Sequence, residues 1–473
     1  MFLSLFFDAA RQASGLLSRA ALLALPFGAY AQSPASLTGD WTGTLGPLTL
    51  TAHLTDPAGG PCTATLDVPL QNARGLPLQF TAPTADSVYL RFPQAKAYFA
   101  GRRAAASQQL VGEWHQSGQA LPLTLARAAA GAPAGPRRPQ APKPPFPYQA
   151  ADVTFTNAAA GVVLAGTLTT PAGPGPFPAV VLLTGSGPED RNETLFGHQP
   201  FAVLADYLSR RGIAVLRFDD RGVGQSGGSQ ATSTSADYAA DALAALAFVR
   251  AQPKIAPAHV GLLGHSEGGT AAIAATSQPQ GPNFLVLLAA PGLPGNELIV
   301  QQVLALNKLA GATPTQLQST EKTQRQLLTI VEQTPDDAQA RAQLRPLLGA
   351  GGAASPGALA QADGKINVLL SPAYRHLLAD RPAQTLPHVH CPVLALDGMK
   401  DVQVAAAPNL AALAQGLKAG GNRDVTTQAL PGLNHLFQTA STGAVSEYGT
   451  IEETFAPSAL QIIGDWVSAH ASR

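Results

Sequence analysis

Residues 259–276 read HVGLLGHSEGGTAAIAAT, which is an apolar strand, a glycine-flanked turn and the small residues of a helix in direct succession. Such a turn forces the backbone of Ser266 into a strained conformation at the head of a sheet, and the flanking glycines remove side chains that would clash with strand and helix. The amide groups at the start of the helix then face the negative charge that develops when a serine hydroxyl attacks. We therefore predict that Ser266 is a nucleophile.

The segments around this turn alternate between strand-like and helix-like patterns, which is typical of a mostly parallel sheet with helices on both faces. We expect this α/β domain to cover residues 148–473. The predicted strands of an eight-stranded sheet are 153–156, 162–169, 179–183, 214–218, 260–263, 284–289, 393–396 and 425–430. The predicted helices are 201–211, 236–250, 268–276, 405–417 and 459–469.

Between residues 294 and 387 the strand pattern stops, and polar, leucine-spaced helical sequence replaces it. A helix over 314–333 is expected to begin behind Thr313, because a capping residue is followed there by a proline at the first helical position. An insertion before the next strand lies over the carboxyl edge of the sheet, where ligands bind in open α/β sheets. We therefore expect a helical lid over 294–387.

A second serine between glycines occurs in GQSGG at residues 224–228, and the overlapping stretch 222–227 fits the GxGxxG pattern of dinucleotide binding. This stretch does not follow a strand directly and no helix begins at once behind it. Two carboxylates, Asp219 and Asp220, also precede it and would repel a pyrophosphate. We interpret Ser226 as part of a flexible loop, and we disfavour a dinucleotide-dependent oxidoreductase.

A serine hydroxyl is a poor nucleophile until a base takes its proton. Among the ten histidines, His435 is favoured because residues 430–437, LPGLNHLF, form a loop between the last predicted strand and the final helix. His265 lies beside the nucleophile, but the turn points it elsewhere. His388 and His390 resemble a metal pair, yet they lack an acidic or cysteine partner of suitable spacing, so we expect no metal ligands there.

A carboxylate must fix the tautomer of that histidine, and two aspartates just beyond a predicted strand are candidates. Asp397 is still at the strand terminus beside Gly398 and is expected to form a turn. Asp401 can reach back over the sheet edge. We therefore assign the acid to Asp401.

Two backbone amides are needed to stabilise the oxyanion that forms during attack. One is assigned to Glu267, which directly follows the nucleophile. The other is assigned to Ser186 in the loop GSGP at residues 185–188, with Gly187 as the alternative, because glycines let the chain approach a substrate closely.

The N-terminal part of the chain is organised differently. Arg19 precedes the apolar run 20–25 and the small-x-small pattern AYA at 29–31, so we expect residues 1–31 to be a signal peptide and the mature chain to be secreted or periplasmic. Residues 37–128 alternate apolar and polar positions, which predicts a small β-sandwich or barrel. The Pro/Ala-rich residues 129–147 are expected to be a linker whose basic residues serve solvation.

Two similar tripeptides, GDW at 39–41 and GEW at 112–114, lie near the two ends of this β domain and are expected to mark pairing between its first and last strands. Cys62 and Cys391 fall in different domains, so we predict no disulfide between them. No later apolar stretch reaches the roughly 18 residues that a membrane span needs.

Composition narrows the function further. Hydrophobic residues make up 45% of the 473 residues and charged residues only 13%, and 30 Lys plus Arg balance 30 Asp plus Glu. No net field attracts nucleic acid or an anionic membrane surface. A small, nearly neutral substrate fits better.

Several segments together resemble the bacterial α/β-hydrolases of the esterase and serine-aminopeptidase-like group, over roughly residues 150–472. The matching stretches are GSGPEDRN at 185–192, FDDRGVG at 218–224, GHSEGG at 264–269, LDG at 396–398 with Asp401, GLNH at 432–435 and SPAYR at 371–375. The resemblance implies an α/β-hydrolase fold and a triad in the order Ser266, Asp401, His435. It also implies an acyl-serine intermediate, carboxylic esters as the commonest substrates, and neither metal nor cofactor. Members with an additional N-terminal β domain resemble secreted esterases.

Three functions remain open at this point. The first is a carboxylesterase acting on a small neutral ester. The second uses the same groups to cleave peptide or amide bonds, as aminopeptidase-like relatives do. The third is a non-enzymatic envelope- or carbohydrate-binding protein whose N-terminal β domain is the functional part.

Overall fold

A computed structural model describes residues 37–471 except for 46–47, 56–62, 69–72, 83, 85, 105–107, 117–118, 129–136, 231–232, 279 and 350–355. The chain divides into two compact units. One is made of residues up to 135 with a short piece at 355–360, and the other of 136–354 and 361–473. The predicted signal peptide and Cys62 lie outside the described residues.

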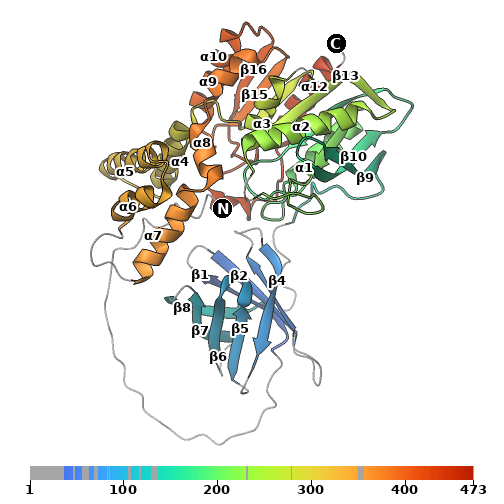
Figure 1. Ribbon diagram of the computed structural model, residues 1–473. Coiled ribbons are helices and arrows are strands. Elements are labelled where there is room, and N and C mark those ends of the chain that lie inside the picture. The colour runs from blue at the N-terminus through green and yellow to red at the C-terminus, as the bar shows by residue number, and fades with distance from the viewer. Residues whose placement is uncertain are drawn as a thin grey trace, which may run out of the picture. The chain divides into compact units, whose positions relative to one another are not determined.

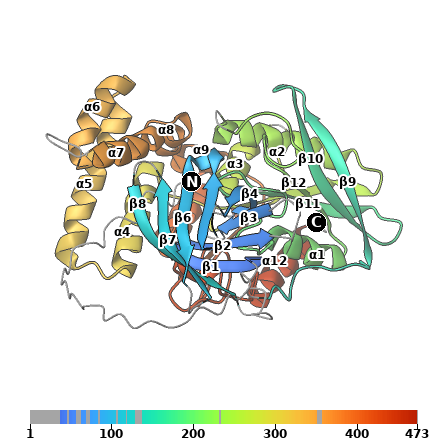
Figure 2. The same ribbon diagram turned by 90° about the horizontal axis from the view of Figure 1, so that it is seen from below.

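The strands of the first unit are β1 (Gly39–Leu45), β2 (Leu48–Thr55), β3 (Thr63–Val68), β4 (Ala73–Thr81), β5 (Ser87–Phe92), β6 (Ala97–Arg103), β7 (Gln109–Gln116) and β8 (Gln119–Arg127). They form a closed antiparallel barrel (Figures 1 and 2). Alternate side chains point inward, and Trp41, Phe99 and Leu110 are fully buried there. Of the two architectures predicted for this region, the barrel is the one observed.

The pairing expected from the two tripeptides is wrong in one respect. The barrel closes through β1 and β8, where Trp41 lies opposite Arg127. The second tripeptide, at residues 112–114, lies on β7, which pairs with β6 and β8. One more hairpin follows this tripeptide, so the last strand is the one after it.

The end of the predicted linker, residues 137–147, is part of the second unit. Arg138 donates hydrogen bonds to the carbonyl groups of Phe196, Gly449 and Ile451 at 2.8, 3.0 and 2.9 Å. Its side chain is half-buried. The expectation that the basic residues here serve solvation is therefore wrong for Arg138. Prolines have no backbone N–H group, so in this proline-rich stretch a long side chain donates the hydrogen bonds instead.

The second unit is built on a sheet with strands β9 (Tyr148–Asn157), β10 (Val162–Pro171), β11 (Phe177–Leu183), β12 (Ala214–Phe218), β13 (Ile255–His265), β14 (Leu285–Leu288), β15 (Val393–Gly398) and β16 (Val425–Leu430). Their order is β16-β15-β14-β13-β11-β12-β10-β9. Strands β11 to β16 are parallel, whereas β10 is antiparallel to both β9 and β12. All eight predicted strands are present.

Helices cover both faces of this sheet (Figure 1). On one face lie α1 (Pro200–Arg210) and α12 (Pro457–His470), whose apolar side chains share a core with Val180 and Leu182 of β11. On the other lie α2 (Ser235–Arg250), α3 (Glu267–Thr276) and α10 (Ala406–Ala419), whose apolar side chains share a core with Val181 and Leu183. Because successive side chains of a strand point to opposite faces, continuous apolar strands feed two separate cores.

The insertion between β14 and β15 is helical, as predicted. It consists of α4 (Gly295–Leu309), α5 (Pro314–Gln333), α6 (Asp337–Leu347), α7 (Pro356–Leu369), α8 (Pro372–Ala379) and α9 (Pro382–Thr385). The predicted start of α5 is confirmed, since Thr313 Oγ1 accepts a hydrogen bond from the Gln316 amide. Figures 1 and 2 both show α4 to α8 grouped at the end of the unit opposite β9 and β10.

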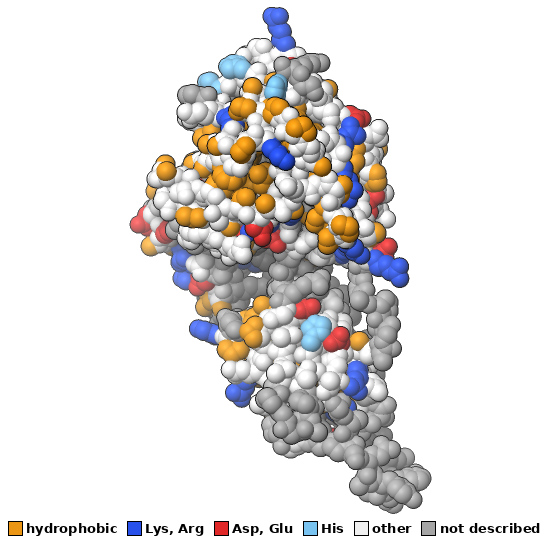
Figure 3. Space-filling model, turned by 90° about the vertical axis from the view of Figure 1, so that its right-hand side faces the viewer, with side chains coloured by type: hydrophobic (Ala, Val, Ile, Leu, Met, Phe, Trp, Pro, Cys, Tyr) orange, Lys and Arg blue, Asp and Glu red, His pale blue; other side chains and the backbone are white. Residues whose placement is uncertain are grey.

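The surface reflects the low charge content of the sequence. On the face drawn in Figure 3, side chains of either charge lie scattered among apolar and neutral ones. Within the described residues, no helix has both the length and the apolar character required to cross a bilayer.

Candidate active site

Ser266 stands at the crossing from β13 into α3, with a backbone φ of 52° and ψ of −120°. Glycines on both sides permit this close crossing. A methyl group on Gly264 would lie 2.2 Å from the carbonyl oxygen of Gly268, and one on Gly268 would lie 2.3 Å from that of Leu183. A positive φ on a serine is a strained conformation that persists only where the surrounding structure enforces it, and such strain gathers at functional sites.

Two loops at the carboxyl edge of the sheet bring the predicted base and acid together. His435 follows β16, Asp401 follows β15, and both are buried. His435 Nδ1 lies 2.5 Å from Asp401 Oδ2. The other oxygen, Asp401 Oδ1, accepts hydrogen bonds from the amides of Gln403 and Val404 at 2.7 and 2.8 Å, so the carboxylate is held from both sides.

The imidazole of His435 also lies beside the turn that carries the nucleophile. Its ring centre is 4.8 Å from that of His265, the residue before Ser266. Since Nδ1 faces Asp401, Nε2 is the nitrogen left to meet the serine. Within the described residues no hydrogen bond joins this nitrogen to Ser266 Oγ, and such bonds are often long before substrate binds.

The segments predicted to supply the oxyanion donors approach Ser266 from two sides. Glu267 is the first residue of α3, where amide groups have no carbonyl partner within the helix. The loop after β11 passes close by, since a methyl group on Gly185 would lie 3.5 Å from Ser266 Cβ. The Gly185 amide already donates to Glu193 Oε1, and the exposed Ser186 follows it.

Asp397 does not form the turn expected of it. It is the fifth residue of β15, its side chain is 1% exposed, and neither oxygen has a hydrogen-bond partner. Burial, together with the nearby charge of Asp401, raises the pKa of Asp397 to about 10. The group is therefore a neutral acid at pH 7, and Asp401 is the carboxyl group that faces the histidine.

The competing serine is fixed by the backbone. Ser226 Oγ donates to the carbonyl oxygen of Asp219 at 2.7 Å and accepts from the Ala165 amide at 2.9 Å. Arg191 holds the Asp219 carboxylate with two of its nitrogens. The expectation of a flexible loop is wrong: the polar residues of this glycine-rich stretch tie it to neighbouring strands.

The sequence missed a buried histidine–carboxylate pair at the site. His265 Nδ1 lies 2.7 Å from Glu193 Oε1, and His265 Nε2 donates to the carbonyl oxygen of His435 at 3.0 Å. The exclusion of His265 as the base holds in this geometry, because both ring nitrogens are occupied. Glu193 stands in a loop between β11 and α1, 72 positions before His265, and no local pattern distinguishes it.

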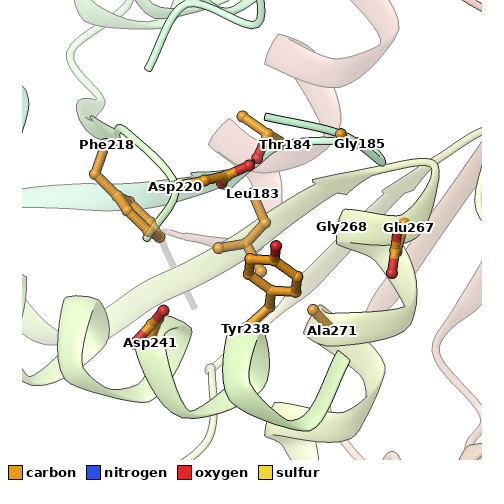
Figure 4. A pocket seen from close by; sticks show the side chains of 11 residues that line it. Leu183, Thr184, Gly185, Phe218, Asp220, Tyr238, Asp241, Glu267, Gly268 and Ala271 are labelled. Atoms are coloured by element: carbon orange, nitrogen blue, oxygen red, sulfur yellow. The ribbon is translucent and has the colours of Figure 1, made fainter. Parts of the chain in front are cut away.

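A small cavity lies beneath the oxyanion segments, between β11, α2 and α3 (Figure 4). Gly187 and Glu267 line it from the oxyanion side, and Figure 4 shows Asp220 and Tyr238 around its interior. Burial raises the pKa of Asp220 to about 8 and also raises that of Glu267. Asp220 in the lining is therefore largely protonated at pH 7, whereas the lining residue Asp241 forms an ion pair with Arg221. In the described part of the chain no three His, Cys, Asp or Glu side chains are arranged to hold a metal ion.

Part of the chain resembles known proteins. Residues 198–355 match the family described as serine aminopeptidase, S33. Esterase EstD of Thermotoga maritima is 33% identical over 171 residues, which make up 36% of this chain and 39% of that protein. The resemblance to the esterase and serine-aminopeptidase-like α/β-hydrolases is confirmed. The chain thus matches about two fifths of the length of this relative.

Two solved structures resemble the chain at lower identity. The α/β-hydrolase GrgF from Penicillium sp. sh18 is 16% identical with a TM-score of 0.44, covering 69% of this chain and 100% of GrgF. The Pyrococcus furiosus esterase Pf2001 is 14% identical with a TM-score of 0.43, covering 72% of this chain and 98% of that esterase. Similarity at this level leaves function to be argued from the site itself.

Proposed function

We propose that this chain is a serine hydrolase that cleaves small, nearly neutral carboxylic esters through an acyl-serine intermediate. The observation that carries the proposal is the buried 2.5 Å contact between His435 Nδ1 and Asp401 Oδ2 beside the strained turn of Ser266. The three residues come from separate loops at the carboxyl edge of one parallel sheet. A nucleophile, a base and an orienting acid in this order are what acyl transfer requires.

In the proposed reaction, Ser266 Oγ attacks the ester carbonyl carbon and His435 Nε2 takes its proton. Asp401 holds the ring in the tautomer with Nδ1 protonated and stabilises the imidazolium that forms. The oxyanion accepts hydrogen bonds from the amides of Glu267 and Ser186. The intermediate then collapses as His435 returns the proton to the departing alcohol, and water repeats the sequence to release the acid.

We further propose that the helical insertion acts as a lid on this site. Its support is the position of Asp380, the residue after α8, whose charge adds to the effect of burial in raising the pKa of Glu267. The backbone of Asp380 also accepts a hydrogen bond from Gly295 at the start of α4. The insertion therefore comes within electrostatic range of the residue that follows the nucleophile.

Cleavage of amide bonds is the second candidate, because the matching family is described as a serine aminopeptidase. The same three residues would serve either reaction. Turnover of p-nitrophenyl acetate and butyrate against a panel of aminoacyl anilides separates the two. A higher kcat/KM for the anilides than for the esters would show that the chain is a peptidase rather than an esterase.

Substitution of the nucleophile tests the proposal directly. Ser266→Ala is expected to abolish p-nitrophenyl acetate turnover and fluorophosphonate labelling while the thermal unfolding transition is retained. Ser226→Ala, in the competing motif, is the matched control and should keep both activities, at a stability cost of about 1–3 kcal/mol for each of the two buried backbone groups that lose their partner. Retained turnover by pure Ser266→Ala protein would refute the assignment. Absence of labelling in the folded wild type would favour a binding protein.

A further inference from the structure

A second histidine–carboxylate pair lies directly behind the proposed triad. Glu193 Oε1 lies 2.7 Å from His265 Nδ1 and accepts from the amide of Gly185 at 2.8 Å. His265 Nε2 donates to the backbone carbonyl of His435 at 3.0 Å. Glu193 is 4% and His265 6% exposed. One ion pair thus connects the oxyanion loop, the nucleophile turn and the loop of the base.

The contacts of His265 favour a charged pair. A carbonyl oxygen can only accept, so His265 Nε2 carries a proton, and the carboxylate oxygen at Nδ1 calls for a second one. Burial alone would lower the pKa of His265, but the charge and hydrogen bond of Glu193 outweigh it and raise the pKa to about 9. The other ionisable groups that face the pair are Asp401, whose charge raises the pKa of His265, and Glu189 and Asp220, whose pKa values are raised in part by the charge of Glu193.

The backbone of Glu193 gives an independent sign that its place is enforced. Its φ is 52°, in the left-handed region that side chains rarely adopt, and its amide donates to the Asp190 carbonyl at 2.8 Å. Strain of this kind costs about 1–3 kcal/mol and persists where surrounding contacts hold it. Here those contacts are the ones to His265 and Gly185.

We propose that Glu193 and His265 are positioning residues that hold the oxyanion loop and the His435 loop at fixed places around Ser266. The role rests on the proposed hydrolase function. Neither residue takes a proton from substrate. Glu193 contacts Gly185, which immediately precedes the proposed oxyanion donor Ser186. His265 contacts the backbone of His435, whose ring is the proposed base. Both contacts therefore act on residues next to, or part of, the reacting groups. A displacement of about 1 Å at such groups lowers a rate by about 10²-fold.

Glu193→Gln is the sharpest perturbation, because it is isosteric. In the wild type one oxygen, Glu193 Oε1, accepts from both Gly185 and His265. In the variant the side chain is a neutral amide, so the His265 ring is uncharged and has no proton at Nδ1 to donate to that oxygen. One of the two contacts must break. We expect kcat for p-nitrophenyl acetate to fall about 10²-fold with little change in KM, together with slower fluorophosphonate labelling. Glu321→Gln, on the exposed face of α5, is the matched control and should behave as wild type.

His265→Asn is the second variant and separates the two contacts. Its side chain reaches the position of Nδ1 but not that of Nε2, so the contact to Glu193 can persist while the His435 carbonyl loses its donor. We expect a loss of kcat here as well, with an altered pH profile because a buried positive charge beside His435 is gone. The profile distinguishes positioning of the base from a general loss of stability.

Imidazole nitrogen NMR of the resting protein tests the pair without any substrate. We expect one histidine ring to remain doubly protonated at pH 8, and to lose that state in Glu193→Gln with a shift of the His435 ring signals. If the wild-type protein neither turns over esters nor reacts with fluorophosphonate, the proposed function is overturned. The NMR measurement then still shows whether Glu193 and His265 form an ion pair. The positioning role is overturned if the wild type is active, the kcat of Glu193→Gln lies within threefold of the wild-type value at every pH, and the His435 signals do not shift.

Discussion

Replacement of Asp401 by asparagine tests the proposed triad through a single proton. Asp401 Oδ1 accepts from the amides of Gln403 and Val404, and a side-chain amide can keep both bonds only through its oxygen. The NH₂ group of Asp401→Asn must then replace Oδ2, 2.5 Å from His435 Nδ1. An NH₂ group can only donate, so Nδ1 must lose its proton and Nε2 must carry it. That tautomer cannot accept the proton of Ser266.

The size of the effect follows from this inversion. The base is present, buried and in place, but in the wrong protonation state, and no other acceptor faces its Nδ1. In a serine protease triad the same inversion lowers kcat about 10⁴-fold, which corresponds to about 5.5 kcal/mol in the barrier. We expect a loss of this order for Asp401→Asn, with KM nearly unchanged because the substituted group does not touch substrate.

The assay is p-nitrophenyl acetate hydrolysis at pH 7 to 8, with the thermal unfolding midpoint as a check on folding. Asp465→Asn, an exposed position on α12 paired with Arg211, is the matched control and should keep full activity. A loss of less than tenfold in folded Asp401→Asn protein would refute the tautomer argument. If the residual rate then disappears in an Asp397→Asn, Asp401→Asn double variant, Asp397 would be the orienting acid instead.

The remaining predictions concern stability. Gly268→Ala places a methyl group 2.3 Å from the Leu183 carbonyl oxygen, so we expect the free energy of unfolding, measured by urea titration, to fall by about 2–3 kcal/mol. Gly364 in α7 has open space around it, so the control variant Gly364→Ala should be slightly more stable than the wild type. Burial raises the pKa values of Asp220 and Glu189 to about 8, so the folded chain holds protons that the unfolded chain releases near pH 4. Stability should therefore decline as pH rises from about 5 to 8, and a flat or rising profile would contradict this.

The elements nearest the nucleophile were predictable because their signals are local. The continuous apolar residues of β13 and β14 are read as buried parallel strands, and the glycines around Ser266 specify a tight crossing within a few residues. The Thr313–Pro314 pair likewise marks the start of α5 by itself. In each case one short stretch contains the whole physical reason for the structure.

The supporting contacts were not predictable because their partners lie in different loops. Glu193 reaches His265 only after its own backbone adopts a left-handed conformation, which no neighbouring residue announces. The partition between Asp397 and Asp401 was predicted from reach along the chain, but the neutral state of Asp397 depends on burial by the finished sheet. The closure of the barrel through β8 likewise depends on counting hairpins that alternate too weakly to be numbered from sequence.

The carboxyl groups of Glu189, Glu193, Asp220 and Asp397 lie around the site. Their protonation states explain why only Glu193 among them is paired with a cation. Glu189, Asp220 and Asp397 would add negative charge to this end of the sheet if all three were ionised, but burial raises their pKa values to about 8, 8 and 10, so they are mainly neutral at pH 7. Glu193 contacts the oxyanion loop directly, because its oxygen accepts from the Gly185 amide. It is also the one matched by a buried cation, His265, and the pair together presents little net charge to the reacting carbonyl. Above pH 8 to 9 this compensation is lost, because the buried acids ionise and His265 loses its proton, so ester turnover should decline at alkaline pH.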